Sequence, residues 1–363
     1  MIEEENKGSP SSTNSSSSHL FGKLSPEFFE RVIYSRLGAS RQEVLIGPTT
    51  GVDTCVIRIN QNQVLISTTD PISLIPELGP ADSAWMSINL LANDLSTSAF
   101  KPQYLMLDLN LPPSISEETL EAYWESLSGE CARLGIAIVG GHTGRFEGGS
   151  DSTIIGSGTL FSTGSAHYLT ARNAKLGDSV ILTKSAALSA TAILARTFPE
   201  KVKDRIGAEG FERAREYFRK ISACEDALAA ASIGVGVGGV TAMHDVTEGG
   251  VVSALYELAR ASSLGLAVDR AKIPVERETR EICSIFKIDP YTSLGEGALV
   301  ISCHPSKADD VIRVLGSRGT PARVVGELLE PTAGIRFFEN GIEVPYTFPI
   351  VDHYWKAYYD SHR

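Results

Sequence analysis

The stretch GVDTCVIRINQNQVLISTTDP, residues 51–71, contains two β-rich runs joined by a short polar turn. The runs TCVIRI and QVLISTT flank the turn at residues 60–63, and this pattern predicts a β-hairpin. A turn that is symmetric about these residues places Asp53 opposite Asp70. Like charges paired about 5 Å apart destabilise a sheet, and a divalent cation with oxygen ligands would neutralise them. The alternative is two solvated aspartates at strand ends, because a register slip of one residue removes the pairing.

Residues 83–100 form the next informative segment, a predicted helix with an unusual polar side. Apolar residues recur at helical spacing from Trp85 to Ala99. The remaining surface contains no Lys, Arg or Glu, and carries short polar residues instead: Ser87, Asn89, Asn93, Asp94, Thr97 and Ser98. A solvated helix face normally uses long charged side chains. The pattern therefore indicates a polar ligand or a buried interface, and the alternative is packing against another subunit.

Strands and helices alternate through the rest of the chain. Further strands are predicted at 103–111, 136–141, 153–161, 179–183, 240–246, 264–269, 297–303 and 322–328. This alternation indicates an α/β layer structure. A length of 363 residues suggests two domains. The segment 162–175 has no clear period and is the expected linker.

Composition excludes several classes of protein. The formal net charge is −11 without a basic block, so we expect no nucleic-acid partner. No apolar run approaches the roughly 18 residues of a membrane span, so we expect no membrane partner. The polar N-terminus and five scattered cysteines without a CxxC pair favour the cytoplasm. Residues 1–23 are Ser-rich, and we expect a disordered tail there.

Two glycine-rich turns are candidate ligand loops. IVGGHTGR, residues 138–145, is an apolar run that ends in paired glycines. MHDVTEGGVV, residues 243–252, predicts a strand, a turn and a helix start. There, Thr247 is a reasonable N-cap, and Gly249 and Gly250 expose N–H groups at the positive helix end, which suits phosphate. The alternative is that these glycines serve only turn geometry. GVGVGG, residues 234–239, lacks a clear strand–helix context and is set aside.

Five motifs occur in an order that resembles one known superfamily. It contains aminoimidazole ribonucleotide (AIR) synthase, hydrogenase expression/formation protein E, selenophosphate synthetase and thiamine-monophosphate kinase. The resemblance spans about residues 24–340 and is closest to the hydrogenase maturation branch. The motifs are GVDT (51–54), STTDP (67–71), NDLSTSAFKP (93–102), VGGHT (139–143) and HDVTEGG (244–250).

The resemblance implies a two-domain AIR synthase-like α/β (α+β) fold. The expected N-terminal domain, residues 24–165, binds ATP and metal and forms a homodimer through its sheet. The expected C-terminal α/β domain covers residues 166–345, and residues 346–363 form a tail.

The resemblance also implies a site for ATP and Mg²⁺ between the two domains. It makes Asp53, Asp70 and Asp94 the predicted metal ligands. Predicted ATP-binding residues are Asn93, Gly140, Gly141, Thr143, Asp245, Thr247, Gly249 and Gly250. Predicted catalytic residues are Asp94, His142 and Glu296. The implied activity is phosphoryl transfer or ATP-driven dehydration of a small molecule, and the alternative is a nucleotide-binding assembly or regulatory protein without turnover.

The chain departs from the family pattern at two places. His142 stands where relatives often have an acid, and imidazole is a poorer magnesium ligand than carboxylate. His142 could accompany a weaker cation site, act as an acid/base group, or be structural. The last cysteine is Cys303, so the modified C-terminal cysteine of the maturation branch is missing. Lys184 is either a phosphate ligand or an exposed strand-end lysine, and His244 is expected to be a structural neighbour of Asp245.

Overall fold

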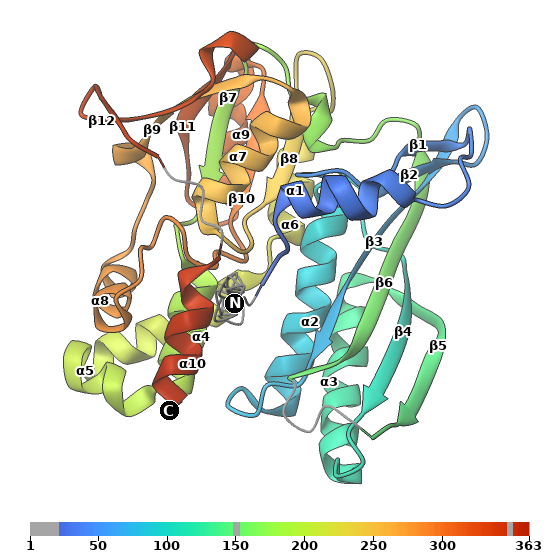
Figure 1. Ribbon diagram of the computed structural model, residues 1–363, viewed down its shortest axis with the longest axis vertical. Coiled ribbons are helices and arrows are strands. Elements are labelled where there is room, and N and C mark those ends of the chain that lie inside the picture. Colours follow the sequence, from blue (N-terminus) through green and yellow to red (C-terminus); the bar gives the residue numbers. More distant parts are fainter. Residues whose placement is uncertain (1–21, 148–152, 347–350, 363) are drawn as a thin grey trace, which may run out of the picture.

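The computed structural model describes residues 22–147, 153–346 and 351–362 (Figure 1). Two β-sheets, each packed against helices, form the body of the chain. The predicted mixed α/β fold with two sheet-containing halves is confirmed. The expected disordered tail lies almost wholly outside the described residues. Within the described residues, no helix is long and apolar enough to cross a membrane.

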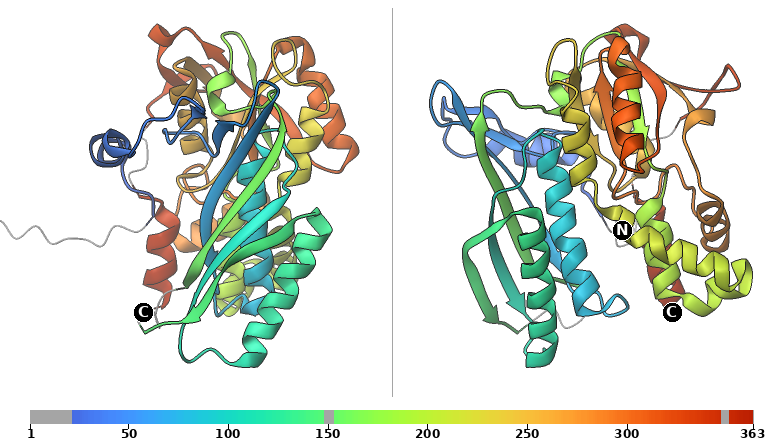
Figure 2. Two further views of the ribbon diagram at one scale, coloured as in Figure 1. Left: turned by 90° about the vertical axis from the view of Figure 1, so that its right-hand side faces the viewer. Right: turned by 180° about the vertical axis from the view of Figure 1, so that it is seen from behind.

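The first sheet contains the strands of the N-terminal half in the order β1-β2-β3-β6-β4-β5. Figures 1 and 2 show α2 and α3 on one face of this sheet only. Alternation in β4 explains the packing, because its four leucines are buried and the residues between them are exposed. The bounds are β1 (Val44–Ile46), β2 (Cys55–Arg58), β3 (Gln63–Ser73), β4 (Tyr104–Leu111), β5 (Ala137–Arg145), β6 (Ile154–Ser165), α2 (Gly79–Ser96) and α3 (Glu117–Leu134).

The predicted hairpin of β2 and β3 is confirmed, but its register differs by one residue. Arg58 pairs with Val64, and Asp70 pairs with Gly158 of β6. The prediction that Asp53 and Asp70 are ladder partners is therefore wrong. The turn is centred on Gln61 instead of between Gln61 and Asn62, and both Ile59 and Asn60 donate backbone N–H groups to the Gln63 carbonyl.

The second sheet contains the remaining strands in the order β13-β12-β9-β11-β7-β10-β8. All its pairings are antiparallel except that of β12 with β9. The predicted linker is too long, since β6 continues to Ser165. The strands are β7 (Ser179–Thr183), β8 (Val240–Asp245), β9 (Gly265–Asp269), β10 (Leu299–Cys303), β11 (Ala322–Leu329), β12 (Ile335–Glu339) and β13 (Ile342–Val344).

Helices of the second half surround its sheet and extend beyond it (Figure 1). They are α4 (Leu188–Thr197), α5 (Pro199–Glu216), α6 (Cys224–Ala231), α7 (Gly250–Ser262), α8 (Arg277–Phe286), α9 (Ala308–Ser317) and α10 (His353–His362). The last of these lies in the expected C-terminal tail, yet Tyr354 and Tyr358 of α10 are buried in a core with α4 and α5. The C-terminal segment is therefore part of the packed structure.

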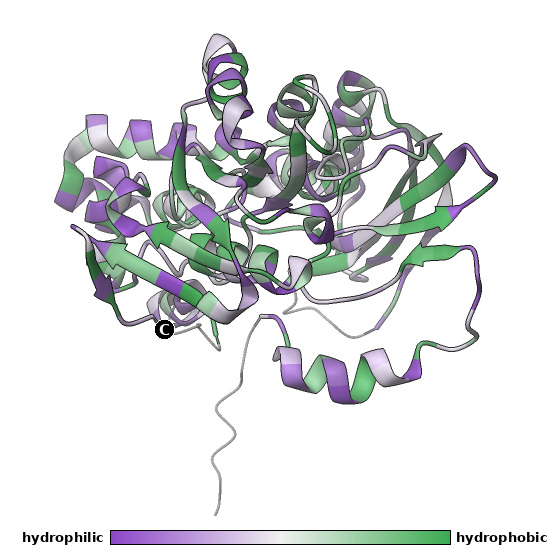
Figure 3. Cartoon of the chain, turned by 90° about the horizontal axis from the view of Figure 1, so that it is seen from above, coloured by the Kyte–Doolittle hydropathy of each residue, from purple (hydrophilic) through white to green (hydrophobic). Residues whose placement is uncertain are grey.

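A short helical segment precedes the first sheet. It comprises α1 (Pro26–Phe28) and two further turns that continue to Arg36, close to the predicted helix. Figure 3 shows this segment beside the main body, with polar and apolar residues interspersed. Ser25 begins it, because its hydroxyl accepts the Phe28 N–H and so caps the first turn.

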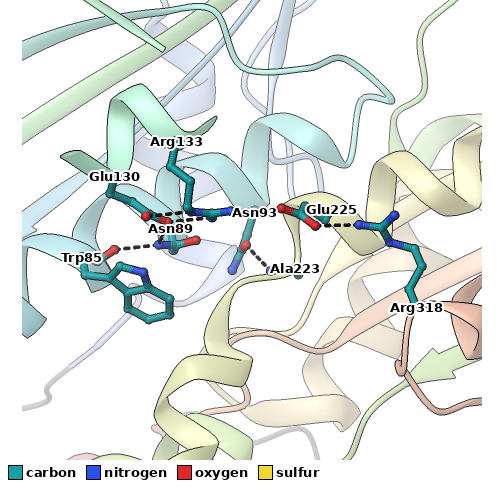
Figure 4. Close-up of polar contacts among 8 residues, drawn as sticks. All are labelled: Trp85, Asn89, Asn93, Glu130, Arg133, Ala223, Glu225 and Arg318. Atoms are coloured by element: carbon teal, nitrogen blue, oxygen red, sulfur yellow. Dashed lines mark hydrogen bonds and ion pairs between the residues drawn. The ribbon is translucent and has the colours of Figure 1, made fainter. Parts of the chain in front are cut away.

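The polar side of α2 packs against the second half of the same chain. The Asn93 amide donates to the Ile221 carbonyl at 2.8 Å and accepts from the Ala223 N–H at 2.7 Å. Figure 4 shows a series of polar contacts that passes from Asn89 through Arg133 to Arg318. Short side chains suit this helix because its polar side is a buried interface within one chain, and not an interface with another subunit.

Candidate functional site

His244, at the end of β8, joins the two halves of the chain through two carboxylates. Its Nδ1 lies 2.7 Å from Oδ1 of Asp53, which precedes β2. Its Nε2 lies 2.8 Å from Oε2 of Glu257 on α7. Burial alone would lower the pKa of His244, but the charge and hydrogen bonds of Asp53 and Glu257 raise it well above its ordinary value. These neighbours favour the protonated imidazole, whose Nε2 hydrogen-bonds Glu257 and whose Nδ1 forms an ion pair with Asp53.

Asp53, His244 and Asp245 present ligand atoms that all lie within 4.8 Å of one another. Geometry alone would make these three residues a metal site. Both ring nitrogens of His244 face carboxylates, Asp53 and Glu257, so we assign this residue to the positioning of Asp53. The carboxylates of Asp53 and Asp245 are the ligands that remain, and hard oxygen ligands suit Mg²⁺.

Two further carboxylates come from the first half of the chain. Asp70 lies on β3, and Asp94 lies on α2, where its Oδ2 accepts a hydrogen bond from Thr68 at 2.9 Å. Burial, with the charge of Glu248, raises the pKa of Asp70 to about 7. Burial and the charges of Asp245, Asp70 and Asp53 raise the pKa of Asp94 well above its ordinary value. These mutual effects place the aspartates in one electrostatic cluster.

The second half of the chain completes this cluster with Asp245 and Glu296. Both are buried, with 2% and 9% of their surface exposed. Burial and neighbouring charge raise the pKa of Asp245 to about 7 and that of Glu296 well above its ordinary value. Among the described residues, Oδ2 of Asp245 has no hydrogen-bond partner. A buried set of carboxylates with an unpartnered oxygen fits a divalent cation.

The loop Thr247–Gly250 borders the acidic cluster, and other parts of the chain already contact it. Nζ of Lys23 donates to Oγ1 of Thr247 at 2.8 Å and lies 3.9 Å from Glu248. The Gly249 N–H donates to the Asp352 carboxylate at 2.7 Å. The Gly250 N–H donates to the Thr247 carbonyl. The two N–H groups predicted to bind phosphate therefore have partners within the chain.

The predicted β5 residues do not join the acidic cluster of their own chain. Asp70, Gly158, Leu107 and Gly141 lie in one row across the sheet, from β3 to β5. Three strand spacings separate the ends of this row, about 14 Å. Gly140, Gly141 and Thr143 are thus distant from Asp70, and the structure corrects their predicted place in the site.

His142 is still less suited to act beside Asp70 in the same chain. It pairs with the exposed Asp108 and so extends from the open face of the sheet. Asp70 shares the face of Thr68, which contacts α2. The exposed His142 ring lies near Phe146, with ring centroids 6.1 Å apart. His142 therefore does not face Asp70 of its own chain.

Asn93 and Lys184 also differ from their predicted roles. Asn93 is fully buried, and its amide bonds the backbone of the second half, so it does not face ATP. The Lys184 ammonium is neither exposed nor free, because it donates to three carbonyls, including that of Gly297, and lies 2.9 Å from Asp226. Both residues hold segments of the fold together next to the cluster.

The sequence analysis missed four residues that border the cluster: Lys23, Glu248, Glu257 and Asp352. Glu248 stands inside the HDVTEGG motif and could have been found there. Glu257 lies on α7 beyond the motif, and Lys23 lies at the edge of the Ser-rich segment. Asp352 lies far along the chain from the loop it contacts. No local pattern marks these last three residues.

Comparison with protein families matches both halves of the chain. The N-terminal domain of AIR synthase related proteins matches residues 51–161, and their C-terminal domain matches residues 175–337. The chain belongs to the AIR synthase-related family. This membership agrees with the two sheets and with the five motifs in order.

Relatives within this AIR synthase-related family have several activities. The chain is 26% identical to carbamoyl dehydratase HypE of Escherichia coli over 266 residues, covering 71% of this chain and 75% of that protein. It is 24% identical to a selenide, water dikinase of Dechloromonas aromatica over 348 residues, covering 86% and 94%. The structure of hydrogenase maturation protein HypE in complex with ATP has a TM-score of 0.62 at 19% identity, covering 90% and 94%. This likeness shows a shared fold.

Proposed function

We propose that this protein binds ATP with Mg²⁺ and uses it for phosphoryl transfer to, or ATP-driven dehydration of, a small molecule. The observation that carries the proposal is the cluster of Asp53, Asp70, Asp94, Asp245 and Glu296, drawn from both halves of the chain. Asp245 and Glu296 are buried, and the other three are half-buried. A cluster of this charge is costly to bury without cations. Binding of a metal–phosphate ligand would account for the presence of this cluster, and packing alone does not.

Asp53, Asp70, Asp94 and Asp245 are the residues that would hold the cation. Mg²⁺ supplies positive charge that neutralises the phosphates during transfer. His244 fixes Asp53 by an ion pair, so that carboxylate is oriented before a ligand arrives. Burial and the charge of Asp245 raise the pKa of Glu296 well above its ordinary value, which suits it to donate a proton or a hydrogen bond to a reacting oxygen.

The relatives support ATP as the ligand and leave both types of reaction open. One similar fold was solved in complex with ATP, and the relatives include a dehydratase and a dikinase. We propose that residues 24–165 bind ATP and metal and that residues 166–345 close the site. The substrate is a small molecule, since the cluster lies between these halves.

We further propose that the protein is a homodimer formed through the open face of the first sheet. Three apolar side chains of the adjacent strands β4 and β5 are exposed: Tyr104 by 38%, Met106 by 47% and Val139 by 53%. Contiguous exposed apolar surface is typical of an interface. In a dimer of this kind, Gly140, Gly141, His142 and Thr143 of β5 would serve the partner's acidic cluster, not their own.

Substitution of the cluster tests the proposed enzyme. Asp70→Asn and Asp245→Asn should each reduce ADP release by about 100-fold or more, a loss of roughly 3 kcal/mol of transition-state stabilisation. Asp204→Asn, at an exposed position of α5 outside both sheets, is the matched control and should retain activity. Equal ADP release by all three variants and the wild type would contradict catalysis at this cluster.

The alternative is a nucleotide-binding assembly or regulatory protein without turnover. The histidine at 142 and the internal partner of the Gly249 N–H favour it. Magnesium-dependent ATP binding with no ADP release, across candidate carboxylate and carbamoyl substrates, would favour this alternative. Slow ADP release that stops in Asp70→Asn would favour the enzyme.

A further inference from the structure

Both ends of the described chain reach the loop Thr247–Gly250. Lys23, near the N-terminus, contacts Thr247 and Glu248. Asp352, near the C-terminus, contacts Gly249. A cation and a carboxylate of the protein therefore lie at the same loop that borders the acidic cluster. The Lys23 ammonium has the same sign of charge as a metal ion, and the Asp352 carboxylate has the same sign of charge as a phosphate group.

The Asp352 carboxylate occupies the best anion-binding group of this loop. Gly249 is the N-cap of the 13-residue helix α7, and its N–H belongs to the positive end of that helix. Oδ2 of Asp352 accepts from Gly249 at 2.7 Å, and Oδ1 accepts from the Tyr354 N–H at 2.8 Å. Asp352 is only 4% exposed, so this contact is fully formed. A phosphate oxygen cannot use the Gly249 N–H until Asp352 leaves it.

The Lys23 ammonium is the corresponding cation. Partial loss of water around the ammonium would lower its pKa, but the charges of Glu257, Glu248, Asp245 and Asp53 together raise it. Lys23 therefore experiences the field of the cluster as a counter-ion. Its side chain is 51% exposed, so it can leave without opening the core.

The two terminal segments also contact each other. Gly22 packs so close to the Trp355 indole that a Cβ at this position would lie 3.2 Å from Nε1. Tyr354 and Tyr358 anchor α10 in the core. The Tyr358 hydroxyl donates to Glu77 at 3.3 Å, in the connection before α2. One helix thus holds Asp352 on the loop and provides a surface for the segment that carries Lys23.

We propose that Lys23 and Asp352 form a self-inhibitory latch, which mimics a bound cation and phosphate and which a nucleoside triphosphate with its divalent cation must displace. The latch rests on the proposed function of the acidic cluster. Phosphate takes the Gly249 N–H from Asp352, and the metal takes the place of the Lys23 charge. The helix α10 stays docked through Tyr354 and Tyr358, and only the Asp352 side chain and the Gly22–Lys23 segment move.

Removal of each latch residue should strengthen ligand binding. The probe is ATP with Mg²⁺, and its affinity is measured by calorimetry on the full chain. Asp352→Asn keeps the shape of the side chain but removes its charge, and should bind about tenfold tighter, because a hydrogen bond to a charged group is stronger than one to a neutral group. Lys23→Met should bind more tightly at low Mg²⁺ concentration. Asp360→Asn and Lys356→Met, an exposed ion pair on the same helix, are the matched controls and should bind as the wild type does.

The outcomes separate the latch from the proposed function. If the wild type binds ATP, and Asp352→Asn and Lys23→Met bind it no more tightly than the wild type does, the latch is overturned. The proposed function then stays in place. No ATP binding by the wild type or by either variant overturns both. Binding by Asp352→Asn that far exceeds binding by the wild type supports both.

A second measurement on the wild-type protein avoids any effect of substitution on folding. Addition of ATP with Mg²⁺ should accelerate amide hydrogen exchange in the first turn of α10, where the Tyr354 N–H loses its bond to Asp352. Slower exchange at this turn when the ligand binds would overturn the latch. The exposed turn at Asn60–Gln63 serves as an internal reference.

Discussion

Nδ1 of His244 lies 2.7 Å from Oδ1 of Asp53. This contact joins the end of β8 to the segment that precedes β2. His244 is the buried cation between two carboxylates, Asp53 and Glu257. It connects the acidic cluster to the core of the second half. The charge of His244 and that of Lys23 lower the pKa of Glu257 to about 2, although burial opposes the shift.

Substitution His244→Leu should destabilise the protein by about 3 kcal/mol, because removing one partner leaves buried charge uncompensated. Urea unfolding of the metal-free protein measures this change. His304→Leu is the matched control, since His304 is exposed and its side chain only caps a short helical turn at Ser306, and it should cost no more than about 1 kcal/mol. Equal effects of the two substitutions would contradict the ionic role of His244.

The stability of the metal-free protein should fall as pH rises from about 4 to about 7. Burial raises the pKa of both Asp70 and Asp245 to about 7, so the folded state binds more protons than the unfolded chain in this window. Mg²⁺ favours the ionised carboxylates, and its stabilising effect should therefore be larger at about pH 8 than at about pH 5. Thermal unfolding at both pH values, with and without Mg²⁺, tests the sign. The double variant Asp70→Asn with Asp245→Asn should lose most of the Mg²⁺ effect, and an effect independent of pH would contradict this account.

Asn93→Ala should destabilise the contact between the two halves by about 2 kcal/mol, because it leaves the buried Ile221 carbonyl and Ala223 N–H without their partner. Chemical unfolding with far-UV circular dichroism measures the loss. Asn62→Ala in the exposed hairpin turn is the control and should be nearly neutral. An Asn93→Ala protein as stable as this control would show that the amide does not hold the halves together.

Much of the architecture follows from the sequence, because strand alternation and helical spacing are local signals. The leucines of β4 and the strand–helix alternation of the second half are examples. The hairpin shows the limit. Its turn is centred on Gln61, with Asn60 accepting the Asn62 N–H, and this local geometry shifts the register by one residue.

The acidic residues were predictable from the motifs, but their partners were not. Asp53 meets His244, which is distant in sequence, and not Asp70 in its own hairpin. The short polar residues of α2 indicated a buried interface, and only the fold shows that this interface lies within the chain. His142 occurs in a family motif, but its strand lies at the edge of the sheet, away from Asp70.

Met106→Asp should disrupt the proposed homodimer, because a charge is costly in an apolar interface. Light scattering after size-exclusion chromatography should show a dimer for the wild type and a monomer for the variant. Leu176→Asp, on a residue that is 52% exposed outside the first sheet, is the matched control and should remain dimeric. A wild-type monomer would contradict the dimer, as would a dimer that Met106→Asp leaves intact.

Calorimetry of ATP binding, with and without Mg²⁺, tests the central claim most directly, which is that the acidic cluster binds a metal–nucleotide ligand. For the wild type, we predict binding that depends on Mg²⁺ and weakens by about tenfold or more, roughly 1.4 kcal/mol, in Asp70→Asn. The control Asp204→Asn should bind as the wild type does. ATP affinity that is the same with and without Mg²⁺, and unchanged in Asp70→Asn, would contradict the assignment of the cluster.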